Sequence, residues 1–178
     1  MKQILASLCF AILLIGCETT GSRWSAEMSQ THLQALETLS FQELEQEAER
    51  VAGGGVSPYA PNAYVLYAYA IEALESGDSE QRSQGMDALV IAALEGEEAM
   101  SYQLRPRAGG TPVVEPATVR RGGLPEAQYR LYREWIDDPA RETEALLVLM
   151  QAALANYPPA LEAWDAEERA GRFDGGGR

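Results

Sequence analysis

Residues 63–74 form a segment that is apolar on almost every side. The segment reads Ala-Tyr-Val-Leu-Tyr-Ala-Tyr-Ala-Ile-Glu-Ala-Leu and carries one charged side chain, Glu72. A helix that is apolar all round has to be buried among other elements. The rest of the chain must therefore supply enough structure to surround this segment, and the pattern of that structure decides the fold class.

Other segments carry apolar residues at helical spacing and are separated by Gly or Pro. Ser40 and Glu43 form a capping box before a predicted helix over 41–52, and glycines 53–55 end it. Asp78 and Asp138 are candidate caps for later helices. No run alternates between apolar and polar residues for long enough to predict a strand. We expect an all-α fold of antiparallel helix pairs, with the further helices over 79–95, 97–103, 125–136, 139–155 and 160–170.

Residues 105–123 differ from the rest of the chain. Three prolines and four glycines make regular structure improbable there, so the sequence predicts a Gly/Pro-rich loop within a helical domain over 31–170. A structureless segment of this length in a compact domain is usually either functional or mobile.

The first residues have the parts of an export signal. Lys2 is followed by an apolar run of 13 residues, from Ile4 to Gly16, which is shorter than the roughly 20 residues that span a bilayer. Leu14-Ile15-Gly16-Cys17 resembles the lipobox of bacterial lipoproteins. The resemblance implies a signal peptide over 1–16, cleavage before Cys17 and lipidation of its thiol. The alternative is a plain signal peptide with an incidental cysteine.

Location follows from the same resemblance. Glu18, rather than Asp, follows the lipobox cysteine, which implies an outer-membrane lipoprotein facing the periplasm if the source is Gram-negative. The polar residues of 17–30 are predicted to form a flexible tether. The glycine-rich end, 171–178, is predicted to be disordered.

Two helix pairs look alike, since each joins an aromatic helix to one rich in Ala and Leu. Leu146, Met150, Ala153 and Pro158 resemble the second helix of a tetratricopeptide repeat, and the pairs also resemble Sel1-like repeats. This implies an α-solenoid. Ala92-Ala93 and Ala152-Ala153 lie 60 residues apart, against a repeat length of about 34 to 40, so an irregular helical bundle is the alternative.

The charge of the chain limits its partners. Its net charge is −13, and without residues 1–16 it carries 13 Arg and 27 acidic residues, which leaves −14. So acidic a chain is not expected to bind nucleic acid, which requires a basic surface. His32 is the one histidine and has no cysteine or second histidine to share a metal, so we expect a solvent-facing helical residue and neither metal nor cofactor.

Two groups of residues are candidates for binding an envelope protein. Between 105 and 133 six arginines accompany two acids, and guanidinium groups recognise carboxylates and phosphates. Tyrosines of the apolar segment are candidates for a peptide groove. The candidate residues are Arg105, Arg107, Arg120, Arg121, Tyr64 and Tyr67. The alternatives without a binding role are that the arginines form ion pairs with acidic residues of the same chain and that the tyrosines are part of the hydrophobic core.

The expected function is a non-enzymatic scaffold or interaction module, anchored to the membrane through Cys17. One alternative is a peptidoglycan-acting enzyme with a carboxylate acid, since paired acids occur at 43–49, 97–98, 137–138 and 167–168. Solvated helix faces explain such acids better. A purely structural envelope lipoprotein is the other alternative.

Overall fold

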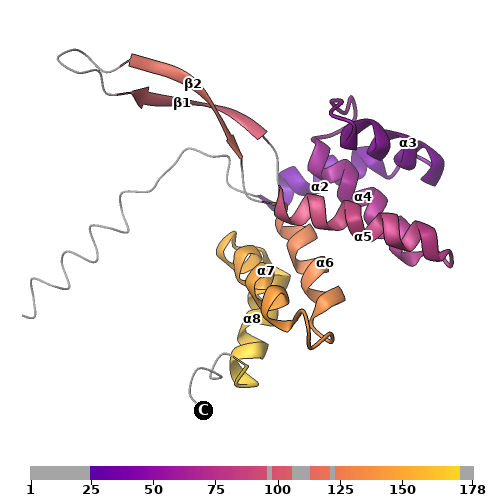
Figure 1. Ribbon diagram of the computed structural model, residues 1–178, viewed down its shortest axis with the longest axis vertical. Helices are drawn as coiled ribbons and strands as arrows, with labels where there is room; N and C mark the ends of the chain where they lie inside the picture. Colours follow the sequence, from indigo (N-terminus) through magenta and orange to yellow (C-terminus); the bar gives the residue numbers. More distant parts are fainter. Residues whose placement is uncertain (1–24, 96–97, 106–112, 121–122, 173–178) are drawn as a thin grey trace, which may run out of the picture.

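The computed structural model describes residues 25–95, 98–105, 113–120 and 123–172 (Figure 1). In chain order its elements are α2 (Ala26–Leu36), α3 (Phe41–Ala52), α4 (Asn62–Glu75), α5 (Ser79–Leu94), β1 (Glu98–Arg105), β2 (Val113–Arg120), α6 (Pro125–Trp135), α7 (Glu142–Leu154) and α8 (Pro158–Arg169). No helix in these ranges has both the length and the apolar character that a membrane crossing requires.

Local signals in the sequence set several helix ends. The Ser40 hydroxyl accepts from the Glu43 amide, and the Glu43 carboxylate accepts from the Ser40 amide at 2.8 Å, so the predicted capping box is confirmed. Asp78 caps α5 by accepting from the amides of Glu80 and Gln81 at 2.8 and 2.9 Å. These contacts satisfy amides that have no partner within the helix.

Three predicted boundaries were wrong. The tether was predicted to extend to residue 30, but α2 begins at Ala26 because Ser25 caps it, accepting from the Met28 amide at 3.2 Å. Asp138 caps only a turn, and α7 begins at Glu142. The last helix was predicted to begin at residue 160, but α8 begins at Pro158, because a first-turn proline loses no hydrogen bond.

The body of the molecule is built from helices that pack mainly on their neighbours in sequence. From α3 to α8 each helix contacts the next, with α4–α5 and α6–α7 as the most extensive pairs, whereas α2 packs on α4 (Figure 1). Three small side chains on α4 and α5 are fully buried: Ala70, Ala73 and Ala93. Because they are small, the two helices can pack close to each other in the core. The expected all-α fold is confirmed for this body, and α4 is mostly buried, as its apolar sequence predicts.

The segment between α5 and α6 is a β-hairpin, where a short helix over 97–103 and a loop over 105–123 were predicted. Strands β1 and β2 pair in antiparallel register from Glu98↔Arg120 to Arg105↔Val113. The sequence of β1 alternates between apolar and polar residues, with Met100, Tyr102 and Leu104 as the apolar ones. This alternation is typical of a strand, and the prediction of a helix did not take it into account. Pro116 is compatible with pairing because both strands of a two-stranded ribbon are edges. The hairpin extends away from the helices (Figure 1).

The chain returns from the hairpin by passing close to the end of α5. The Leu124 amide donates to the Ala92 carbonyl at 2.9 Å, and the Gln128 side chain donates to the Ala93 carbonyl at 3.1 Å. A β carbon on Gly123 would lie 1.6 Å from the Ala93 carbonyl oxygen, so only glycine fits this crossing. These contacts fix where α6 begins relative to α5.

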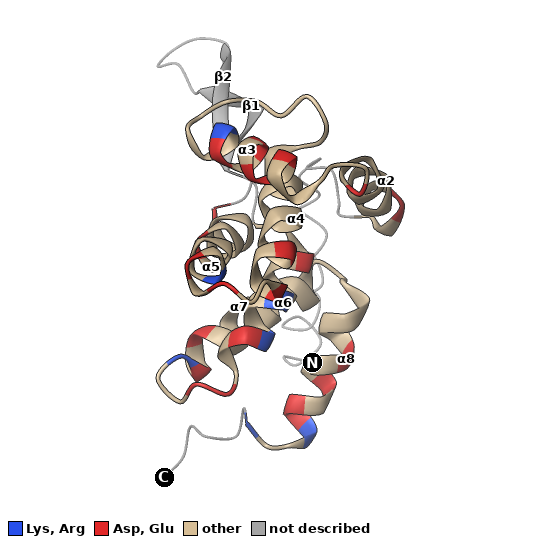
Figure 2. Cartoon of the chain, turned by 90° about the vertical axis from the view of Figure 1, so that its right-hand side faces the viewer, with Lys and Arg blue, Asp and Glu red and all other residues tan. Residues whose placement is uncertain are grey.

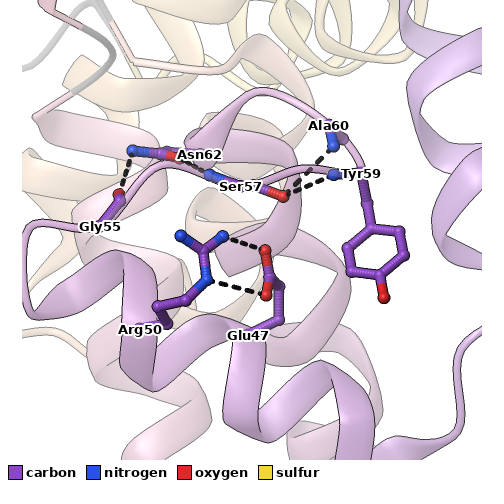
Figure 3. Close-up of polar contacts among 7 residues, drawn as sticks. All are labelled: Glu47, Arg50, Gly55, Ser57, Tyr59, Ala60 and Asn62. Atoms are coloured by element: carbon purple, nitrogen blue, oxygen red, sulfur yellow. Dashed lines mark hydrogen bonds and ion pairs between the residues drawn. The ribbon is translucent and has the colours of Figure 1, made fainter.

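The loop between α3 and α4 is held by polar contacts (Figure 3). Arg50 binds both carboxylate oxygens of Glu47, and this interaction holds the pKa of Glu47 below its usual range, with help from Ser57. Asn62 accepts from the Ser57 amide at 3.0 Å and donates to the Gly55 carbonyl at 3.2 Å. The loop between α3 and α4 therefore has a defined course, which is set by Asn62, the first residue of α4.

The end of α8 is tied to α6 and α7. Glu167 is 9% exposed, accepts a hydrogen bond from the Tyr132 hydroxyl and pairs with Arg172 at 2.9 Å. Arg172 also contacts Glu142 at 3.3 Å. The tail was predicted to be disordered from residue 171, but Arg172 has these contacts; residues 173–178 lie outside the described ranges.

Candidate binding groove

A groove with a volume of about 450 Å³ lies beside α2. Its walls come from α2, α4, the first turn of α6 and the start of α8. We call it the α2 groove and define it by its lining residues: Ala26, Ser29, Gln30, Leu33, Gln34, Glu37, Tyr67, Glu126, Tyr157, Pro158 and Pro159. Residues as far apart in sequence as Ala26 and Pro159 therefore contribute to one concave surface, and ligand sites are often found between helices.

Two of the lining residues form a buried polar contact. The Ser29 hydroxyl on α2 donates to Oε1 of Glu126 on α6, and both residues are 5% exposed. Glu126 lies in the first turn of α6, where the partial positive charge of the helix N-terminus favours a carboxylate. A buried carboxylate has to be hydrogen-bonded, so Ser29 joins α2 to α6 at a point where its loss is costly.

Two tyrosines stand near this carboxylate. The pKa of Tyr67 is raised to about 12, first by burial and then by electrostatic repulsion from Tyr157 and Glu126, while Arg130 lowers it. Burial and Glu126 also raise the pKa of Tyr157. Both phenols are therefore neutral at pH 7 and can donate a hydrogen bond. The groove thus combines a carboxylate, neutral hydroxyl groups and proline rings, a set suited to a donor-bearing or cationic ligand.

Helix α2 covers a further tyrosine. The rings of His32 and Tyr64 lie 4.9 Å apart at 44°, and Tyr64 is 4% exposed. His32 is half-buried rather than solvent-facing, because α2 turns this side toward α4. Of the two predicted groove tyrosines, Tyr67 lines the groove, whereas Tyr64 is part of the core beneath α2.

The hairpin separates the predicted arginines. Arg105 pairs with Val113 at one end of the ladder, and Arg120 pairs with Glu98 at the other, seven residues along. At ~3.3 Å per residue the two ends are about 23 Å apart. The two arginine positions therefore lie at opposite ends of a hairpin where a loop was predicted, and their role in binding stays a prediction. Arg107, Arg121 and Cys17 lie outside the described ranges.

Several of the paired acids have structural partners. Glu43 completes the capping box, Glu47 binds Arg50, and Glu167 binds Tyr132 and Arg172. Acidic residues occur on every helix from α2 to α8 (Figure 2). Within the part of the chain that the structure describes, no three or more His, Cys, Asp or Glu residues gather in a way that could hold a metal ion.

The sequence did not point to three of the groove residues. Ser29 fell in the predicted tether, and Glu126 and Tyr157 carried no signal apart from their neighbouring prolines. A residue inside a loop or a first helical turn shows no periodicity, so its burial depends on what packs against it. Only the approach of α2 to α6 and α8 brings these residues together.

No family model, curated protein or solved structure matches this chain.

Proposed function

We propose that the protein is a lipid-anchored envelope lipoprotein that binds another envelope protein through its helical domain, without catalysing a reaction. The observation that carries the proposal is the α2 groove, a concave surface with a buried carboxylate and two half-buried tyrosines. The Cys17 motif supports the anchor, and Glu18 after it supports the outer membrane, facing the periplasm, as the location.

The anchor is tested by lipid labelling. Growth with a clickable palmitate analogue should label the wild type and Cys9→Ser, and both should sediment with membranes. Cys17→Ser should remain unlabelled and unprocessed, because the thiol that receives the lipid is missing. Label on Cys17→Ser, or none on the wild type, would contradict the lipoprotein assignment.

The interaction surface is tested by site-specific crosslinking in cells. A photo-crosslinking amino acid in place of Tyr67 reports from the groove, and the same residue in place of Ser83, which is exposed on α5, is the matched control. We expect one discrete protein adduct from position 67 and none from position 83. No adduct from the groove, or muropeptide release from peptidoglycan by the purified domain, would overturn the proposal.

The arginines are tested in two pairs, because the hairpin separates them. Arg105→Ser with Arg107→Ser changes the Val113 end of the ladder, and Arg120→Ser with Arg121→Ser changes the Glu98 end. If the arginines bind the partner, one pair should weaken the crosslink more than the other. Equal crosslinking by both double variants and the wild type would remove the arginines from the binding surface.

A further inference from the structure

The hairpin receives little support from the rest of the fold. Strands β1 and β2 have each other as their main packing partner, and the hairpin extends away from the helices (Figure 1). An isolated two-stranded hairpin is at best marginally stable in water, and a further strand or a packed helix normally supports it. Each strand also has an outer edge, whose backbone groups can pair with another strand. The hairpin can therefore gain stability from a strand that adds to one of its edges.

A proline decides which of the two edges can take that strand. In an antiparallel pair, residues opposite each other alternate between positions whose backbone groups bond to the partner strand and positions whose groups face outward. Pro116 lies opposite Tyr102 and has no amide hydrogen to donate to β1, so this pair occupies an outward-facing position. The outer edge of β2 therefore lacks a donor at Pro116. The outer edge of β1 contains no proline, and it presents the backbone groups of Met100, Tyr102 and Leu104.

The outer edge of β1 is complementary to itself. When two copies pair in antiparallel register about a two-fold axis at Tyr102, every outward-facing position meets another outward-facing position. Tyr102 meets its own counterpart, and Met100 of each copy meets Leu104 of the other. No charged residue occurs from Ala99 to Leu104, so like charges are not opposed along this stretch. The register therefore joins two hairpins without an unpaired backbone group in the centre of the sheet.

The charges of the chain also favour a second copy in this register. Strands β1 and β2 carry two arginines and two acids, so they are neutral in a chain with a net charge of −13. Each Glu98 stands four residues from the axis at Tyr102, so the two copies of Glu98 are about 26 Å apart at ~3.3 Å per residue. Repulsion between the acidic helical bodies is screened at that distance, because the Debye length is about 8 Å at physiological salt. Arg105 of one copy lies opposite Ala99 of the other, one residue from Glu98, so opposite charges adjoin there.

We propose that two copies of this chain associate through β1 and form a four-stranded antiparallel sheet in the order β2–β1–β1–β2. The second copy supplies the strands that the isolated hairpin lacks. The two β2 strands become the outer edges, where the missing donor at Pro116 opposes the addition of a further strand, so the assembly closes as a two-fold dimer. The α2 groove is built from other elements, so the pairing does not depend on the proposed function.

The first test is disulfide crosslinking in cells that produce the full chain. With an oxidant, Tyr102→Cys should form a disulfide-linked homodimer, because Cα atoms of a hydrogen-bonded pair are about 5.5 Å apart, within the range that a disulfide spans. Met100→Cys and Leu104→Cys should each give at most a tenth of this dimer alone, and should crosslink to each other when they are produced together. The wild type, which has Cys9 and Cys17 but no cysteine in the hairpin, gives the background.

A cysteine on the other strand is the matched control for the register. Thr118 lies opposite Met100 on β2, and Thr118→Cys should stay at the background because the two β2 strands are separated by both copies of β1. Three results would overturn the inference: no homodimer from Tyr102→Cys, equal homodimers from positions 100, 102 and 104, or an adduct of Tyr102→Cys with a different protein in place of the homodimer.

The second test blocks one edge at a time in the full chain with Tyr102→Cys. Met100→Pro removes an outward-facing amide from β1 and should reduce the disulfide dimer at least tenfold. Thr118→Pro removes the amide directly opposite, on the outer edge of β2, and should leave the dimer unchanged. A dimer that survives Met100→Pro would overturn the inference. Sedimentation velocity of the purified wild-type chain needs no variant, and the mass of a single chain at every protein concentration would overturn it as well.

Discussion

Gly85 on α5 lies against Ala73 on α4 so closely that a β carbon on Gly85 would stand 2.7 Å from the Ala73 Cβ. The same added atom would be 3.3 Å from the Ala70 carbonyl oxygen and the Leu74 amide nitrogen. The neighbours that would have to move are thus a short side chain and helical backbone. The packing of α5 on α4 therefore depends on glycine at this position.

Gly85→Ala is expected to lower the free energy of unfolding, despite the better helix propensity of alanine. Overpacking costs about 1–3 kcal/mol, and Gly→Ala in a helix recovers about 1 kcal/mol, so a net loss of up to about 2 kcal/mol follows. Urea denaturation measures the change. Gly77→Ala is the control, because a β carbon there would meet nothing within 4 Å. A Gly85→Ala protein as stable as Gly77→Ala would show that the α4–α5 contact can relax.

Gly123→Ala should be more damaging, because the clash is with backbone. Its β carbon would lie 1.6 Å from the Ala93 carbonyl oxygen, so α6 or the end of α5 would have to shift. We expect a loss of at least about 2 kcal/mol, the upper part of the range for overpacking, together with faster hydrogen exchange of the Leu124 amide. If Gly123→Ala kept the Leu124–Ala92 hydrogen bond and the stability of the wild type, the inference that only glycine fits beside Ala93 would be wrong.

Tyr132→Phe should destabilise the packing of α8 on α6. The change removes the donor to Glu167 and leaves a buried carboxylate oxygen without that hydrogen bond, which costs about 1–3 kcal/mol. Tyr129→Phe, which keeps the ring that contacts Tyr132 and Tyr157, is the control and should cost less. Thermal unfolding of the two variants measures the difference. If the two Tm values are equal, the Glu167 contact contributes nothing.

The raised pKa of Tyr67 leads us to expect that the protein loses stability above pH 10. The pKa of Tyr67 is raised to about 12, so the folded state favours the neutral phenol. Its contribution is fully present below the usual value of 10 and is lost as pH rises from 10 toward 12. Urea denaturation at pH 8 and pH 11 should show a smaller loss for Tyr67→Phe than for the wild type. The same loss in both proteins would mean that Tyr67 titrates normally.

Helix ends were the part of the fold best anticipated from sequence. A capping box satisfies its own orphan amides, so Ser40 and Glu43 begin α3 wherever the helix packs. The hairpin was missed because glycines and prolines outweighed the short alternation at Met100, Tyr102 and Leu104. In a two-stranded ribbon, each strand is stabilised by backbone hydrogen bonds to the other strand. The sequence of one strand alone does not show that its partner is present.

For the candidate site, sequence anticipated Tyr67 but neither Glu126 nor Ser29. Tyr67 lies in the apolar segment 63–74, which has to be buried, so the sequence already marked it as a residue in a packed environment. Ser29 is 97 residues from its acceptor, and the hydrogen bond depends on how α2 packs on α4. Patterns within a window of ten or twenty residues contain no information on such a pair.

The sequence by itself determined that the body of this protein is helical and where most of its helices begin and end, and the lipid on Cys17 stays a prediction from it. Those features arise from local chemistry: capping side chains, prolines, apolar spacing and a short motif at Cys17. Only the tertiary structure decided that α2 forms one wall of a groove, that Glu126 meets Ser29 there, and that Arg105 and Arg120 stand apart. The physical reason is that burial and pairing are shared between distant segments, so they come into existence only when the chain is packed.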